Sequence, residues 1–86
     1  MPSVKVLLFA RLSELAGTRE TEIEVGEGLT VADAYDMLSQ RYPKISELRA
    51  NVMYAVNSEY ATASQPLQAG DELALIPPVS GGSRAL

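Results

Sequence analysis

The stretch "GEGLTVADAYDMLSQRYP", residues 26–43, decides the fold class because it is the clearest helix in the chain. Its apolar residues recur at helical spacing and form one stripe: Val31, Ala34, Tyr35, Leu38 and Tyr42. Thr30 is placed to cap the helix, with Asp33 three residues later completing a capping box. Pro43 ends the helix, because the residue before a proline disfavours helical dihedrals. A helix with a single apolar stripe must bury that stripe, and packing on a mixed sheet is the economical way to do so.

Two strand-like segments precede this helix. Residues 3–9, "SVKVLLF", alternate in polarity, with Val4, Val6 and Leu8 facing the core and Lys5, Leu7 and Phe9 facing outward. Residues 18–25, "TRETEIEV", alternate in the same way, with Thr21, Ile23 and Val25 inward and Glu20, Glu22 and Glu24 outward. The short connection "ARLSELAGT" is typical of a helical turn closed by Gly17. We therefore expect an antiparallel hairpin.

Two further strand-like segments follow the helix. Residues 51–57, "NVMYAVN", predict a third strand, with a turn at Asn57-Ser58. Residues 72–76 predict a last strand whose inward side chains are Leu73 and Leu75. The resulting order is ββαββ. If the first and last strands pair, the fold is an α+β, ubiquitin-like β-grasp with a mixed sheet of four to five strands and one main helix across one face. We assign residues 1–78 to this domain and residues 79–86 to a flexible tail.

Composition excludes several classes of function. The chain has 86 residues, enough for one domain. It contains no cysteine and no histidine, which removes disulfides, thiolate or histidine catalysis and the usual zinc sites. The net charge of −4 and the scattered basic residues oppose nucleic-acid binding. No segment has the length and apolarity of a membrane span or a secretory signal, so we expect a cytoplasmic protein.

The end of the chain, "PPVSGGSRAL", has the properties of an arm that enters another protein. Pro77 and Pro78 stop the last strand and hold the exit extended. Gly81 and Gly82 give the narrowest possible chain with wide freedom in φ and ψ. On composition alone, the same residues are also typical of an ordinary frayed terminus.

Three stretches together resemble a known family. They are "KVLLFARLSELAGT" (residues 5–18), "AVNSEY" (residues 55–60) and "LQAGDELALIPPVSGG" (residues 67–82). They resemble the small subunit of molybdopterin synthase (the MoaD family), whose wider relatives are the ThiS-type and other ubiquitin-like sulfur carriers. The resemblance covers residues 4–82, and "GDELALIPPVSGG" directly after a last strand is its most specific part.

The resemblance implies a mechanism in which Gly82 is the reacting position and Gly81 its companion. A ubiquitin-activating-type enzyme (MoeB-like) adenylates the Gly82 carboxylate with ATP and magnesium, and the adenylate is converted to a thiocarboxylate. The loaded tail enters a large subunit (MoaE-like), where sulfur passes to cyclic pyranopterin monophosphate in a two-plus-two complex. The chain itself is then a non-catalytic subunit that binds no cofactor or metal. Adenylation makes chemical sense because it turns a poor electrophile into an acyl group with a good leaving group.

Outward apolar side chains indicate a surface for that partner. Lys5 and Glu72 mark the outward face of two strands expected to be neighbours, and the same face carries Leu7, Phe9, Ala74 and Ile76. The resemblance implies that Phe9, Tyr60 and Ile76, with Leu7, Pro77 and Pro78, contact the large subunit. Scattered surface residues or a mistaken register would give the same pattern.

The other charged side chains favour simpler interpretations. We expect the row of Glu20, Glu22 and Glu24 to be a solvated strand face, since no convergent ligand accompanies it. We also expect solvation, ahead of partner binding, for Arg11, Arg41 and Arg49.

Four residues, Ser83-Arg84-Ala85-Leu86, follow the glycines where typical family members stop. We rank first a precursor that a peptidase trims after Gly82; a gene boundary, or a paralogue kept as a binding module, are alternatives. Other functions also stay open. They are sulfur transfer to a thiamine, tRNA or cysteine pathway, ubiquitin-like protein modification, and an interaction domain with an inert tail.

Overall fold

The computed structural model describes residues 2–77, and these residues form a five-stranded sheet with helices on one side. The elements follow in the order β1 (Ser3–Leu8), α1 (Arg11–Ala16), β2 (Glu20–Glu24), α2 (Val31–Arg41), the 3-10 helix η1 (Pro43–Asn51), β3 (Met53–Val56), β4 (Glu59–Ala61) and β5 (Glu72–Ile76).

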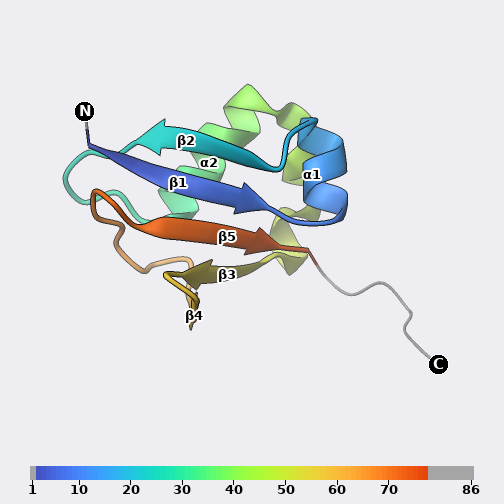
Figure 1. Ribbon diagram of the computed structural model, residues 1–86. Helices are drawn as coiled ribbons and strands as arrows, with labels where there is room; N and C mark the ends of the chain where they lie inside the picture. Colours follow the sequence, from blue (N-terminus) through green and yellow to red (C-terminus); the bar gives the residue numbers. More distant parts are fainter. Residues whose placement is uncertain (1, 78–86) are drawn as a thin grey trace.

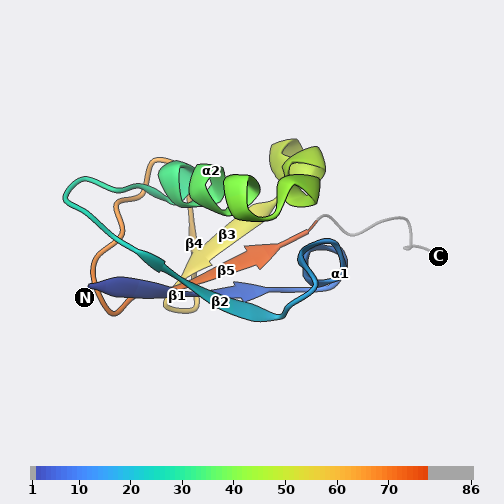
Figure 2. The same cartoon turned by 90° about the horizontal axis from the view of Figure 1, so that it is seen from above.

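The sheet has the strand order β2-β1-β5-β3-β4 (Figure 1). β1 pairs antiparallel with β2 and parallel with β5, and β5 pairs antiparallel with β3. The first and last strands therefore lie side by side in the middle of a mixed sheet. This pairing, with α2 across one face, confirms the predicted ubiquitin-like β-grasp fold (Figure 2).

The core lies between the sheet and the helices. The predicted inward residues Val4, Val6 and Leu8 of β1 are at most 2% exposed, and Leu73 and Leu75 of β5 are fully buried. From α2 the buried side chains are Val31, Ala34, Tyr35 and Leu38, as the helical stripe predicts. Alternation and helical spacing thus place the core correctly.

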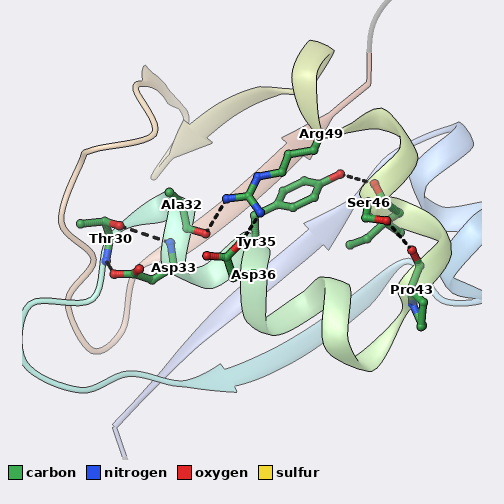
Figure 3. A network of polar contacts seen from close by, with 9 residues as sticks. Thr30, Ala32, Asp33, Tyr35, Asp36, Pro43, Ser46 and Arg49 are labelled. Carbon is green, nitrogen blue, oxygen red and sulfur yellow. Dashed lines mark hydrogen bonds and ion pairs between the residues drawn. The ribbon is translucent and has the colours of Figure 1, made fainter.

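Local capping explains where α2 begins. The Thr30 hydroxyl accepts a hydrogen bond from the Asp33 N–H at 3.2 Å, and the Thr30 N–H donates to Asp33 Oδ2 at 3.0 Å (Figure 3). This is the predicted capping box, worth about 1 kcal/mol to the helix. Pro43 then begins η1, which runs to Asn51.

The predicted tail, residues 79–86, lies outside the described residues. Among residues 2–77, no helix has the length and apolarity needed to cross a membrane.

Candidate functional site: an apolar sheet face beside the C-terminal strand

The face of the sheet opposite α2 carries a continuous row of apolar side chains. Residues directly opposite each other on paired strands share a face. The register places Leu7 beside Ala74, Ala74 beside Ala55, and Ala55 beside Tyr60. This row joins β1, β5, β3 and β4, which are distant from one another in the sequence.

A second row lies closer to the end of β5. Met53 is opposite Ile76 on the same outer face. Phe9 follows the last residue of β1, and its N–H donates to the Leu75 carbonyl at 3.3 Å, which sets Phe9 level with Ile76. We call the two rows together the apolar face: Leu7, Phe9, Met53, Ala55, Tyr60, Ala74 and Ile76.

Three side chains on this face are much more exposed than apolar groups in a core. Phe9 is 45% exposed, Met53 48% and Tyr60 77%, and they are the large exposed apolar residues of the described chain. Ala55, Ser58, Tyr60 and Ile76 line a shallow hollow between them. Clusters of this kind mark surfaces that bind a partner.

The structure brings together most of the residues predicted for this surface. Leu7, Phe9, Tyr60 and Ile76 lie on the apolar face, and Pro77 directly follows it at the end of β5. Pro78, Gly81 and Gly82 lie outside the described residues, so their roles stay predictions.

Sequence reasoning missed Met53 and Ala55. Both belong to the strand predicted from "NVMYAVN", whose two faces were not assigned. Alternation along the strand places Met53 and Ala55 on the same face. Only the pairing of these residues with Ile76 and Ala74 shows that this is the outer face.

The opposite end of the same face is charged. Lys5 is level with Glu22 on β2 and with Glu72 on β5, and its ammonium lies 3.9 Å from a Glu20 carboxylate oxygen. The outer surface is therefore polar at the start of β1 and β5 and apolar where β5 leads into Pro77. A partner docked on the apolar end would contact the base of the arm predicted from Pro77 onward.

Arg11 and Arg41 are exposed, as expected, and Arg49 is half-buried, but all three arginines also bond to groups within the chain. Arg41 donates to the Glu22 carbonyl and to the Thr21 hydroxyl, each at 2.9 Å. Arg49 forms an ion pair with Asp36, and the hydrogen bond to that carboxylate raises the pKa of Arg49 (Figure 3). Arg11 pairs with Glu14 at 3.5 Å, and both side chains are exposed. The carboxylates of Glu20, Glu22 and Glu24 are on exposed residues, as expected.

Within residues 2–77, no group of three or more acidic side chains could hold a metal ion, and no charged residue is buried. The one strongly perturbed group is the Tyr35 hydroxyl, whose pKa burial raises to about 12. Its proton is donated to the Ile45 carbonyl at 2.6 Å, so this group holds the fold together. The arrangement of the described residues is suited to binding a partner.

Comparison with known proteins places these features in context. A profile of the ThiS family matches residues 6–82. The molybdopterin synthase sulfur carrier subunit of Arabidopsis thaliana is 44% identical over 79 residues, which covers 92% of this chain and 82% of the relative.

Solved structures show the same fold. The crystal structure of SAMP1, small archaeal modifier protein 1, from Haloferax volcanii superposes with a TM-score of 0.84 at 39% identity, covering 93% of this chain and 99% of the relative. A complex of subunits 1 and 2 of the molybdopterin-converting factor from Helicobacter pylori contains a chain with a TM-score of 0.66. That chain is 23% identical, with coverage of 93% and 99%, and shows a likeness of fold.

Proposed function

Because this chain belongs to the ThiS family, we propose that it is a sulfur carrier, and specifically the small subunit of a molybdopterin synthase. The observation that carries the proposal is the apolar face at the base of the C-terminal arm, in a chain that resembles a molybdopterin synthase carrier over 92% of its length. The carrier supplies the reacting end and the docking face, and its partners supply the catalysts.

The chemistry is proposed to centre on Gly82. Its carboxylate oxygen attacks the α-phosphorus of ATP in an activating enzyme, pyrophosphate leaves, and a mixed anhydride with AMP forms. Hydrosulfide released by a sulfur donor then attacks the acyl carbon, the bond to AMP breaks, and the product is a thiocarboxylate at Gly82. A large subunit docks on the apolar face and receives the arm, and sulfur passes to cyclic pyranopterin monophosphate. This sequence requires a free carboxylate at Gly82, so we propose that residues 83–86 are removed first.

Intact-mass measurement tests the first half of the proposal. The full-length chain and a chain ending at Gly82 are each incubated with an activating enzyme, ATP, magnesium and a sulfur source. We expect the shortened chain alone to gain the mass of an oxygen-to-sulfur exchange. Equal loading of the two chains would contradict the trimming step, and no loading of either would contradict the carrier role.

A transfer assay tests the second half of the proposal, the delivery of sulfur to the acceptor. The sulfur-loaded chain is combined with a large synthase subunit and cyclic pyranopterin monophosphate, with unloaded chain as the control. We expect the thiocarboxylate to revert to a carboxylate as a dithiolene product appears. Retention of sulfur in a complex that forms stably would point to a different acceptor.

Protein modification is the second candidate function. It is favoured by the likeness to small archaeal modifier protein 1, which is 41% identical over 83 residues. The same adenylated terminus could be attacked by a lysine amine in place of a sulfur donor, which gives an isopeptide bond and releases AMP. Covalent conjugates that appear in extract with the Gly82-ending chain, and not with a chain lacking Gly81 and Gly82, would support this role.

A further inference from the structure

The hydrogen bonds between β1 and β2 show which backbone groups of β2 lie on its outer edge. The Leu8 N–H donates to the Arg19 carbonyl and the Val25 N–H donates to the Pro2 carbonyl. In an antiparallel ladder, alternate residues turn their backbone groups to the same side. The odd-numbered residues of β2 therefore face β1, and the backbone groups of Glu20, Glu22 and Glu24 lie on the open edge.

Side chains occupy half of this open edge. The Thr18 hydroxyl donates to the Glu20 carbonyl at 3.0 Å and accepts from the Glu20 N–H at 3.4 Å. Arg41, from the last turn of α2, donates to the Glu22 carbonyl at 2.9 Å and is held there by the Thr21 hydroxyl. The Tyr42 hydroxyl also reaches Thr21, at 3.4 Å. Both groups of Glu20 and the central carbonyl of the edge are thus satisfied from within the molecule.

The remaining backbone groups of the outer edge could form hydrogen bonds with a strand from another chain. Among residues 2–77, no hydrogen bond from outside the strand reaches the Glu22 N–H or the N–H and C=O of Glu24. An exposed row of such groups is a template for pairing with another chain. The opposite edge of the sheet offers less, because β4 spans three residues.

We propose that the open edge of β2 is a strand-pairing surface for a second copy of this chain, which Arg41, Thr18 and the glutamate row hold closed. An antiparallel pair of β2 strands centred on Glu22 is self-complementary in its backbone groups. It also sets Glu22 opposite Glu22 and Glu20 opposite Glu24, and like charges opposite each other are destabilising. Arg41 and Thr18 occupy backbone groups that this strand pair would use, and the glutamate side chains repel those of the second copy. Both effects oppose pairing of the two β2 strands. Pairing there would leave the apolar face and the arm unobstructed, so this inference does not depend on the proposed function.

Association measurements on matched variants test the proposal. Arg41→Met with Thr18→Val removes the side-chain hydrogen bonds to the edge and keeps the apolar stems. Arg11→Met is the control for charge and composition, because Arg11 lies on α1 and pairs with Glu14. Sedimentation velocity up to millimolar concentration should show at least a tenfold tighter dimer for the double variant than for the native chain. The control should match the native chain.

A proline substitution on the outer edge of β2 tests whether any dimer forms through this edge. Glu24→Pro removes an outward N–H of the open edge while the bonds between β1 and β2 stay intact. Added to the double variant, it should return the chain to the native association state. Amide exchange by NMR should show slowed exchange at Glu22 and Glu24 in the dimer. No gain in association by a folded double variant, or a dimer without protection at these amides, would overturn the proposal.

Discussion

Ala10 has a backbone conformation that its side chain disfavours. Its dihedrals are φ 49° and ψ −123°, in a turn closed by the hydrogen bond from the Leu12 N–H to the Phe9 carbonyl at 3.0 Å. These are the values of the first central residue of a type II′ turn, where glycine is preferred. The Ser13 hydroxyl, which donates to the Ala10 carbonyl at 2.8 Å, helps to hold the turn. This turn ends β1 beside Phe9, so strain is stored at the border of the apolar face.

Ala10→Gly should therefore stabilise the protein. Relief of strain at positive φ is worth about 1–3 kcal/mol, and the added freedom of glycine in the unfolded chain costs about 0.5–1 kcal/mol. We expect a net gain of about 1 kcal/mol in the free energy of unfolding, measured by urea denaturation. The matched control is Ala32→Gly in helical α2, which should lose about 1 kcal/mol. A loss at position 10 equal to that at position 32 would show that Ala10 is unstrained.

At the scale of elements, η1 is fastened to α2 through Tyr35. The Tyr35 side chain is fully buried, and its hydroxyl donates to the Ile45 carbonyl at 2.6 Å. Its ring packs edge-on against Tyr54, with centroids 6.2 Å apart, and the Arg49 guanidinium lies 5.4 Å from the ring centroid. Three elements thus meet at one aromatic side chain, and burial is the main reason its pKa rises to about 12.

Tyr35→Phe should lower stability and change its pH dependence. At neutral pH we expect a loss of about 1–2 kcal/mol, because the buried Ile45 carbonyl loses its donor. The pKa of Tyr35 is raised in the folded state, so its contribution is complete below pH 10 and is lost as pH rises from about 10 to about 12. Over this window the native chain should lose stability more steeply than the variant, by up to about 3 kcal/mol. Urea titrations at several pH values measure this, and parallel slopes for the two chains would contradict it.

At the scale of the whole molecule, the packed core and the proposed docking surface occupy opposite faces of one sheet. The inner face packs against α2 and η1, whereas no element of residues 2–77 covers the apolar face (Figure 2). The exposed side chains of that face, Phe9, Met53 and Tyr60, can therefore be changed at little cost to folding. The proposed docking surface and the base of the predicted arm meet at Pro77, so one partner could contact both.

Met53→Ala and Phe9→Ala should weaken binding to a large synthase subunit by at least tenfold each. Their free energies of unfolding should change by less than about 1 kcal/mol, because both side chains are about half exposed. Isothermal titration calorimetry and urea denaturation measure the two quantities. Gln40→Ala, at an exposed position of α2, is the control and should bind as the native chain does. Native affinity in both variants would remove this face from the proposed interface.

Local sequence predicted four of the strands, the inward side of each assigned strand, and α2 with its cap, because alternation, helical spacing and capping act between residues close in the chain. It assigned no residues to β4. The strained turn at Ala10 and the bonds of Arg41 to the β2 edge had no such signal, since alanine and arginine are common in many settings. Tertiary structure alone decided that Met53 lies beside Ile76 and level with Phe9. Met53 and Ile76 belong to β3 and β5, and Phe9 directly follows β1. The order of these strands in the sheet depends on pairing between distant segments, and alternation within a strand carries no information about its neighbours.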